Sequence, residues 1–308
     1  MHVFITGGSG LVGSEVIPLL VSAGHNVRAL ARSEKSSHAV SALGATPVLG
    51  SQTDVATLSS EAARSDAVIH LAFNHEAAFA GGMEQACEED RAAISAICDA
   101  LLSTGSSASS KIFVNTSGTL SNSRPDELCQ KLVTPFSSRA RSEQLTAEYA
   151  TKGIKAYNIR LSPVTHGPSK EHPFIATQIA VAKQNKQAAY IAQGTNVWPA
   201  VHVKDAAALY VLALDSNSKI PSGANLHAVA EDIPTRKIAE FIGQKLNVPV
   251  KSLASEEAGA AGYGFVAMIM TMDNPTTHAL TTKWTGWTPK EYGLIEELER
   301  DAWKQWSQ

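Results

Sequence analysis

A glycine-rich turn directly after the first hydrophobic run constrains the fold of this chain more than any other feature. Val3-Phe4-Ile5 is expected to form a short buried strand, and Ser14–Ala23 has the apolar spacing of a helix. Gly7, Gly10 and Gly13 stand between them in the spacing GxxGxxG. These glycines match a dinucleotide-binding turn, where they permit a tight turn, close approach to a pyrophosphate and helix-on-strand packing. The alternative is an ordinary strand-to-helix turn.

The second predicted strand, Asn26–Leu30, follows at the distance that a dinucleotide-binding unit requires. NAD-binding folds usually place an acidic residue at the end of this strand, but this chain has Arg32, Ser33 and Lys35 there. A guanidinium pairs with a 2′-phosphate, which a carboxylate would repel. We therefore expect NADP(H) rather than NAD, with Arg32 on the 2′-phosphate. The alternative is that both cations are solvated loop residues. The acidic Glu34 in the same segment is compatible with this alternative.

Composition indicates a cytoplasmic enzyme or sensor. The 308 residues are 44% hydrophobic with a net charge of −3, so the chain can bury a large core as one composite or two-domain unit. The weak acidic balance and the lack of a basic tract argue against a nucleic-acid partner or an anionic membrane. No apolar run reaches the length of a membrane span, and the first one is a core strand rather than a signal peptide.

The cysteines and histidines do not indicate a disulfide framework or a metal site. Cys87, Cys98 and Cys129 are odd in number and widely spaced, as expected of reduced thiols. The 10 histidines are scattered and form no HxxH or HExxH pattern. We expect no bound metal.

Strand and helix patterns alternate through the first two thirds of the chain, as a parallel sheet requires. Strands are predicted at Ala67–Ala72, Ile112–Asn115 and Tyr157–Leu161, and helices at Met83–Leu102 and Ser138–Thr151. The fold class is therefore α/β, a doubly wound Rossmann sheet with a smaller C-terminal substrate-binding α/β domain. We expect the Rossmann domain over residues 1–168 plus about 196–230, and the substrate domain over about 169–195 and 231–308. The later predicted elements are a helix at Ile175–Gln184, a short strand at Tyr190–Ile191, a strand and helix in VWPAVHVKDAAALYVLAL, and helices at Thr235–Leu246 and Leu294–Trp306.

Five segments together resemble the short-chain dehydrogenase/reductase (SDR) superfamily in its extended architecture: TGGSGLVG, DAVIHLAF, VNTSGTL, IRLSPVTHGP and WPAVHVKDAAALYVLAL. NVWPAVHVKDAA and WTGWTPKEYGLIEEL further resemble an atypical subgroup named as NAD(P)-dependent epimerase/dehydratases. The resemblance implies a nicotinamide cofactor and a catalytic tetrad of Asn, Ser/Thr, Tyr and Lys. With the glycine turn, it assigns the cofactor contacts to Thr6, Gly7, Gly10, Leu11, Val12, Gly13, Arg32, Leu71, Ala72, Arg139 and Pro163.

The chain departs from the YxxxK pair of that tetrad. Extended members typically carry a glutamate four residues after the lysine, and Glu143 fits it, which puts Arg139 at the lysine position and Pro135 at the tyrosine position. An arginine can still hold a ribose and supply positive charge, but proline cannot donate a proton. Tyr149 and Lys152 are spaced YxxK and lie ten residues farther along, so we do not expect them to replace the pair.

The other two tetrad positions keep polar side chains. The asparagine position falls on Asp90, for which the alternative is a helix-surface carboxylate paired with Arg91. The strand VNTSGTL offers the hydroxyls of Ser117 and Thr119 at its carboxyl end, where ligands of open α/β sheets lie. We favour Thr119 slightly over Ser117, and a structural role is the alternative for both.

Two histidines follow predicted strands and are candidate proton carriers. His75 comes after the third strand and His166 after the fifth. Histidine is a competent acid at neutral pH, although a lone loop histidine is more often structural. His202 is expected to be a packing residue. Four aromatic residues are expected to line an apolar substrate cleft or a domain seam: Phe73, Phe79, Phe174 and Trp198.

These residues predict an NADP(H)-dependent oxidoreductase that acts on a carbonyl or alcohol of a small organic substrate. Ser117 or Thr119 would polarise the carbonyl, Arg139 would replace the lysine, and His166 or His75 would carry the proton. The missing tyrosine leaves two alternatives open: a cofactor-binding sensor or scaffold without redox turnover, and an isomerase or dehydratase that uses the same cleft. A homodimer is possible, paired through the helices Met83–Leu102 and Ser138–Thr151.

Overall fold

The computed structural model describes residues 1–105, 110–121, 137–168, 172–216 and 219–307, and it forms two compact units. Unit 1 comprises Met1–Leu161, Val203–Ala228 and His278–Thr288. Unit 2 comprises Ser162–His202, Val229–Thr277 and Pro289–Gln308.

Unit 1 contains one segment that the sequence patterns assign to the substrate domain, His278–Thr288. Side chains of this segment bond to the core of unit 1. The Thr281 hydroxyl accepts a hydrogen bond from the His227 backbone at 2.7 Å, and the Trp287 indole donates to the Asp205 carbonyl at 2.9 Å. Such long-range contacts leave no periodic pattern in the sequence.

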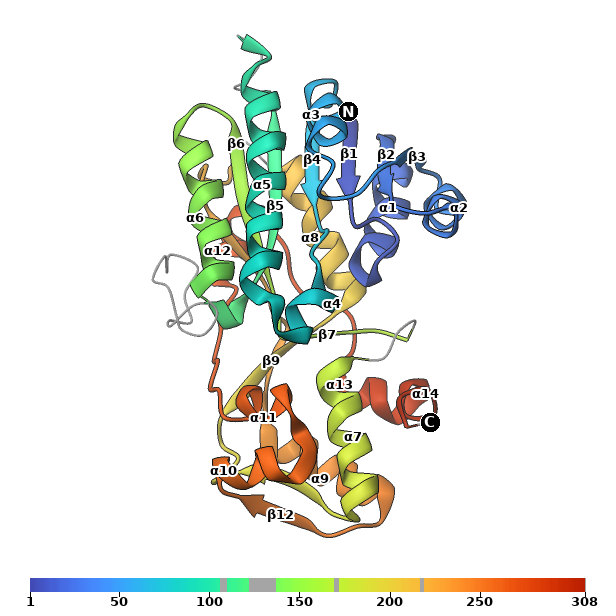
Figure 1. The fold of residues 1–308 in the computed structure, drawn as a ribbon, viewed down its shortest axis with the longest axis vertical. Coiled ribbons are helices and arrows are strands. Elements are labelled where there is room, and N and C mark those ends of the chain that lie inside the picture. Colours follow the sequence, from blue (N-terminus) through green and yellow to red (C-terminus); the bar gives the residue numbers. More distant parts are fainter. Residues whose placement is uncertain (106–109, 122–136, 169–171, 217–218, 308) are drawn as a thin grey trace. The chain divides into compact units, whose positions relative to one another are not determined.

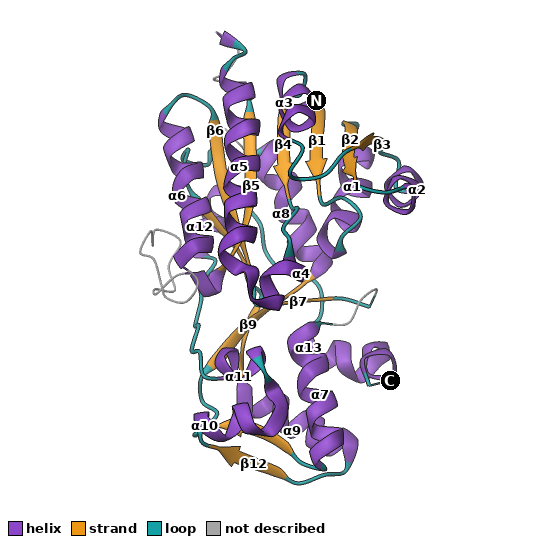
Figure 2. Cartoon of the chain, in the orientation of Figure 1, coloured by secondary structure: helices purple, strands orange, loops and turns teal. Residues whose placement is uncertain are grey.

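A seven-stranded parallel sheet forms the centre of unit 1, in the order β10-β6-β5-β4-β1-β2-β3 (Figures 1 and 2). The doubly wound Rossmann fold is thereby confirmed. The sequence patterns miss the two edge strands of this sheet, β3 and β10. Of these, β3 is short, mostly exposed and contains Pro47, as an edge strand can. The strands are β1 (His2–Thr6), β2 (Asn26–Ala31), β3 (Thr46–Leu49), β4 (Ala67–His70), β5 (Ile112–Gly118), β6 (Lys155–Leu161) and β10 (Asn225–Ala228).

Helices cover both faces of this sheet. Leu30 packs into a core cluster with residues of α3, α5 and α6, which Figure 1 shows in front of the sheet. Its neighbour Ala29 points to the other face, toward Gly8 and Ile17 of α1, because side chains alternate along a strand. The helices of unit 1 are α1 (Leu11–Ser22), α2 (Glu34–Ala42), α3 (Val55–Ala63), α4 (His75–Ala77), α5 (Met83–Leu102), α6 (Ser137–Thr151), α8 (Val203–Asp215) and α12 (Ala279–Thr285), with short turns η1 (Ala78–Gly82) and η3 (Thr119–Ser121).

Unit 2 is built on two small sheets, one of three strands in the order β11-β9-β7 and one of β12 with β8. Its core includes the fully buried Trp198, whose indole donates to the Ile269 carbonyl at 3.2 Å and whose ring meets Phe174 edge-on at 6.0 Å. The strands are β7 (Val164–His166), β8 (Ala188–Ile191), β9 (Val197–His202), β11 (Glu231–Pro234) and β12 (Val250–Leu253).

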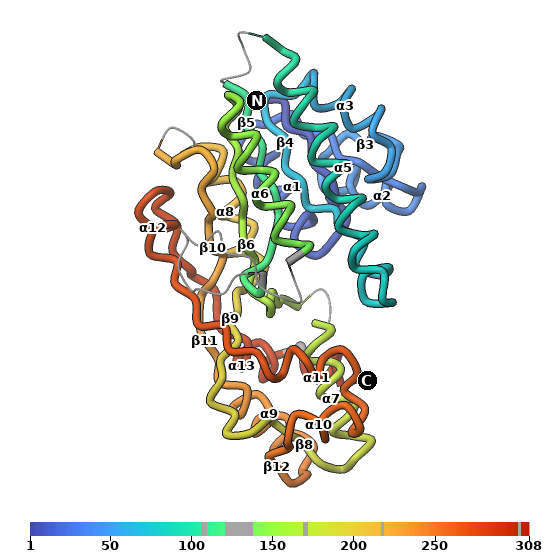
Figure 3. Tube along the Cα trace, turned by 60° about the vertical axis from the view of Figure 1, so that its left-hand side comes forward, coloured from blue at the N-terminus to red at the C-terminus, as the bar shows by residue number. Residues whose placement is uncertain are grey.

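The helices predicted in unit 2 are present in the structure, and short helical elements between Ser255 and Met270 add to them (Figure 3). The C-terminal helix expected at Leu294–Trp306 is continuous, with a π-helical stretch at Leu298–Ala302. The helical elements are α7 (Pro173–Asn185), α9 (Thr235–Leu246), α10 (Ser255–Ala258), η4 (Gly259–Tyr263), α11 (Phe265–Met270), α13 (Leu294–Glu297), η5 (Leu298–Ala302) and α14 (Trp303–Trp306). Among the described residues of both units, no helix combines the length and the apolar character needed to cross a membrane.

The apolar stripe of α5 generates a prediction for stability. Ile94, Ile97 and Leu101 are fully buried at helical spacing against the sheet. Ile97→Ala should lower the free energy of unfolding by about 2–5 kcal/mol, because it removes buried methylene groups and leaves a cavity. Denaturant unfolding measures this change. The control is Leu49→Ala, since Leu49 is 73% exposed and its truncation should stay within about 0.5 kcal/mol of wild type. Equal losses for the two variants would contradict the described packing.

Candidate functional site

The glycine turn between β1 and α1 has the geometry of a phosphate cradle. Gly7 has a φ of +70°, and a Cβ there would come within 2.8 Å of the Ala72 backbone nitrogen at the end of β4. A Cβ at Gly13 would collide with the Gly7 carbonyl oxygen. Gly10 is the N-cap of α1 and provides no side-chain cap, so the first N–H groups of the helix, beginning at Leu11, remain available to an anion.

The residues that follow β2 form an exposed cationic segment. Arg32, Ser33 and Lys35 are exposed, and the Ser33 hydroxyl caps α2 by accepting from the Ser36 backbone at 3.2 Å. Glu34 lies 3.7 Å from His38. Within the described parts of the chain, neither Arg32 nor Lys35 has a carboxylate partner within 4.0 Å. The N-terminus of α2 adds its partial positive charge to theirs.

Asp90 of α5 lies in the interior of unit 1. It is 1% exposed, its Oδ2 accepts from the Ser142 hydroxyl at 2.6 Å, and the same oxygen lies 2.9 Å from Arg139 Nη1. Burial alone would raise the pKa of Asp90, but the Arg139 charge and a hydrogen bond from His70 lower it to about 2. Arg91 pairs with Glu84 at 3.1 Å, so the alternative of an Asp90–Arg91 surface pair is wrong.

Arg139 of α6 lies where the carboxyl ends of β4 and β5 meet. Its Nη2 donates to the Thr116 carbonyl at 2.8 Å, and its guanidinium lies 3.8 Å from the centre of the Phe73 ring. The contact with Asp90 is an ion pair rather than an aligned hydrogen bond, since the buried Nη1 has no hydrogen-bond partner among the described residues. Arg139 therefore presents a fixed positive charge at the carboxyl edge of the sheet.

The two candidate hydroxyls lie at the end of β5. Ser117 is 5% exposed, and its Oγ donates to Glu143 Oε1 at 2.5 Å. Glu143 also accepts from the buried Arg160, at 2.7 Å from Nη2. Thr119 is buried and begins η3. The sequence patterns do not reveal the Glu143–Arg160 pair. Because the Ser117 hydroxyl donates its hydrogen bond to Glu143 of this pair, it has no hydrogen left to donate to a ligand.

Tyr149 and Lys152 lie near the opposite end of α6 from Arg139, about 15 Å along the helix for a separation of ten residues. The Tyr149 hydroxyl donates to Asp99 at 2.8 Å, and burial raises the pKa of this phenol to about 12. The Lys152 ammonium lies 4.1 Å from the centre of the same ring. Tyr149 therefore links α6 to α5, and the pair lies too far from the carboxyl edge of the sheet to act there. Pro135 lies outside the described residues.

The two candidate histidines occupy different environments. His75 begins α4 in unit 1 and is exposed, with its ring 5.0 Å from that of Phe73 and 5.7 Å from that of Phe79. His166 ends β7 in unit 2, is 1% exposed, and has its Nδ1 3.7 Å from Glu297 Oε2.

His202 contacts the same buried carboxylate in unit 2, with its Nε2 3.4 Å from Glu297 Oε2. Burial raises the pKa of Glu297, but the neighbouring His166 and His202 lower it by a larger amount. The net shift of this pKa is therefore downward. His202 thus has the packing position expected of it.

Pro163, expected to contact the cofactor, is also in unit 2.

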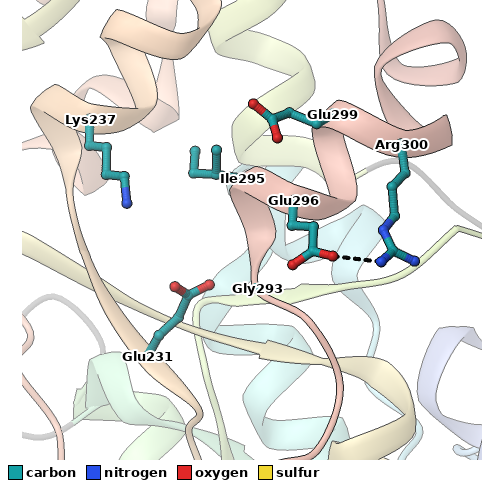
Figure 4. A pocket seen from close by; sticks show the side chains of 7 residues that line it. All are labelled: Glu231, Lys237, Gly293, Ile295, Glu296, Glu299 and Arg300. Carbon is teal, nitrogen blue, oxygen red and sulfur yellow. Dashed lines mark hydrogen bonds and ion pairs between the residues drawn. The ribbon is translucent and has the colours of Figure 1, made fainter.

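Unit 2 contains a pocket of about 620 Å³ with several charged side chains in its lining. Arg300 and Glu296 form an ion pair at 2.6 Å (Figure 4), and Glu231 accepts from the Leu294 backbone at 2.8 Å. None of the predicted site residues lines it. The lining residues are Glu231, Lys237, Gly293, Ile295, Glu296, Glu299 and Arg300.

Comparisons with known proteins agree with the fold and the glycine turn. Residues 3–227 match the model of the NAD dependent epimerase/dehydratase family. The chain is 38% identical to an uncharacterized protein of Schizosaccharomyces pombe, over 98% of this chain and 100% of the relative, and 37% identical to one of Saccharomyces cerevisiae, over 97% and 98%. A solved dTDP-glucose 4,6-dehydratase of Streptomyces venezuelae with NAD and TYD bound is similar with a TM-score of 0.72 and 18% identity, over 99% of this chain and 96% of that one. The chain therefore belongs to the NAD-dependent epimerase/dehydratase family, within the extended SDR superfamily, and is an NAD(P)-dependent enzyme.

Proposed function

We propose that this enzyme is an NADP(H)-dependent oxidoreductase acting on a carbonyl or alcohol of a small organic substrate. The observation behind the proposal is the Arg139 guanidinium, whose side chain is 15% exposed and is held at the carboxyl edge of the sheet by Asp90, the Thr116 carbonyl and the Phe73 ring. The exposed part of a guanidinium can donate hydrogen bonds to a ligand. The hydroxyls of a nicotinamide ribose are acceptors of the required kind.

The other end of the cofactor fits the glycine turn and the cationic segment. Gly7, Gly10 and Gly13, with Thr6, Leu11 and Val12, would hold the pyrophosphate at the N-terminus of α1. Leu71 and Ala72 lie against Gly7 and would flank the adenosine. Arg32 would pair with the 2′-phosphate, which distinguishes NADP(H) from NAD.

The residues at the nicotinamide end divide the chemistry among them. When bound, the dinucleotide supplies or accepts the hydride. Arg139 contributes charge and hydrogen bonds but no proton, because a guanidinium does not deprotonate in proteins. Ser117 or Thr119 would orient the substrate oxygen. While Ser117 donates to Glu143, only its lone pairs are available to a ligand.

His75 is the proton carrier that the geometry favours. It is exposed in unit 1, and its ring contacts Phe73, the same ring that supports Arg139. A histidine exchanges protons near neutral pH without further tuning. His166 is buried beside Glu297, an environment that favours a structural role. Phe73 and the half-exposed Phe79 offer an apolar surface beside His75.

An isomerase or dehydratase reaction in the same cleft is the second candidate function. It is favoured by Pro135, which replaces the tyrosine that extended members use to carry a proton. A panel of aldehydes and ketones, followed at the NADPH absorbance band, distinguishes the two. Bound cofactor without oxidation on any member of the panel would favour the second candidate or a non-catalytic sensor.

Arg32→Ala tests the choice of cofactor. The variant should bind NADPH about 10- to 150-fold more weakly, as expected for loss of a charge-assisted bond of about 1.5–3 kcal/mol. Its affinity for NADH should stay unchanged because NADH has no 2′-phosphate. Fluorescence titration measures both affinities. The control is Arg64→Ala, an exposed arginine elsewhere in unit 1. Equal weakening of NADPH and NADH binding would argue against a contact with the 2′-phosphate.

His75→Gln tests the proton carrier. The turnover of a reducible carbonyl should fall by about 10²–10⁴, the usual contribution of an acid catalyst, while the NADPH dissociation constant stays constant. His38→Gln, at another exposed histidine, is the control. A variant with wild-type turnover would exclude His75 from proton transfer.

A further inference from the structure

His70 joins two parts of the candidate site that are far apart in the sequence. It is the last residue of β4 and is 1% exposed. Its Nδ1 lies 2.8 Å from the Thr6 hydroxyl at the end of β1, and its Nε2 lies 3.3 Å from Asp90 Oδ1 on α5. The ring also stacks on Phe113 of β5, with 6.5 Å between the ring centres. The imidazole is therefore held on three sides inside unit 1.

The hydrogen bonds around His70 fix its tautomer. Asp90 is ionised at neutral pH and only accepts, so the proton of the neutral ring must be on Nε2, facing Asp90. Nδ1 is then an acceptor, and the Thr6 hydroxyl donates to it. This leaves Thr6 Oγ1 free to accept the Ala72 backbone N–H, which lies 3.2 Å away. The bonds run in one direction, from Ala72 through Thr6 and His70 to Asp90.

The two oxygens of Asp90 are thereby assigned to different partners. Oδ1 accepts from His70, while Oδ2 accepts from Ser142 and faces Arg139. The His70 bond prevents rotation of the carboxylate, and so it sets the direction from which Asp90 attracts the guanidinium. Without that donor, Oδ1 would be a buried acceptor lacking a partner, and the carboxylate would turn to find one.

We propose that His70 is a positioning residue, which fixes Asp90 and through it the Arg139 guanidinium in the orientation that binds the nicotinamide half of the cofactor. The inference rests on the proposed function. His70 does not itself touch the cofactor in this account. Its effect on the nicotinamide half is transmitted by Asp90, because Arg139 is the residue whose direction it sets. Its bond to Thr6 is a separate and smaller support of the glycine turn.

Two ligands separate this role from a general loss of structure. NADPH contains both halves of the cofactor, whereas adenosine 2′,5′-bisphosphate contains only the adenosine half. His70→Phe keeps the volume and the ring but removes both hydrogen bonds. It should weaken NADPH binding about tenfold, the effect of losing roughly one buried hydrogen bond, and weaken the binding of adenosine 2′,5′-bisphosphate by clearly less, since that ligand feels only the lost bond to Thr6. His70→Gln, whose amide can still donate to Asp90, should recover NADPH binding to within about threefold of wild type.

Tyr149→Phe is the matched control, because it removes a hydrogen bond between the same two helices, α5 and α6, at the end away from Arg139. It should change neither affinity. If His70→Phe does not fold by circular dichroism, Asp90→Asn takes its place, since it keeps the shape of Asp90 while removing the charge that orients Arg139. It should show the same selective loss of NADPH binding.

Unchanged NADPH affinity in a folded His70→Phe variant, equal weakening of both ligands, or no recovery in His70→Gln would overturn the inference and leave the proposed function intact. A wild-type protein that binds adenosine 2′,5′-bisphosphate but not NADPH would overturn it as well. A wild-type protein that binds neither ligand would overturn the proposed function and, with it, this inference. Selective loss in His70→Phe with recovery in His70→Gln supports it.

Discussion

The buried ion pair between Asp90 and Arg139 is the interaction around which the candidate site is organised. An ionised carboxylate that is 1% exposed is tolerated only when charges and hydrogen bonds compensate for its lost hydration. Here Arg139, Ser142 and His70 together supply them. Because these residues come from α6 and β4, the carboxylate of α5 can be ionised only if all three elements occupy their places. The site is thus a consequence of how unit 1 is packed.

The proposed assignment of Arg139 to the lysine position and Pro135 to the tyrosine position would separate two functions that the superfamily combines on one helix. The planar guanidinium of Arg139 is held by Asp90, by the Thr116 carbonyl and by the face of Phe73. Under this assignment, the enzyme we propose would keep the means of binding the cofactor and would obtain its proton from another element. His75, the exposed histidine that packs beside Phe73, is our proposal for that element.

Local patterns in the sequence were sufficient for most of the fold. The glycine turn, five strands of the central sheet and the helix Met83–Leu102 follow from periodicity and turn residues, and the structure confirms them. The local patterns miss the edge strands β3 and β10 and the helices α2 and α3. They also could not show that the segment His278–Thr288 contributes to unit 1, which it does through contacts with distant residues. Sequence spacing could suggest Arg139 and Asp90 separately, but their pairing depends on how α5 and α6 meet. For His70 the one local signal was a polar residue in the otherwise apolar strand AVIH.

The most direct test of this account is a crystal structure of the protein with NADP bound. We expect the Arg139 guanidinium, still paired with Asp90, within about 3.2 Å of a hydroxyl of the nicotinamide ribose, the usual limit for such a hydrogen bond. Arg32 should contact the 2′-phosphate in the same complex. A cofactor whose nicotinamide ribose lies away from Arg139, or an Arg139 side chain that leaves Asp90 when NADP binds, would contradict the central claim.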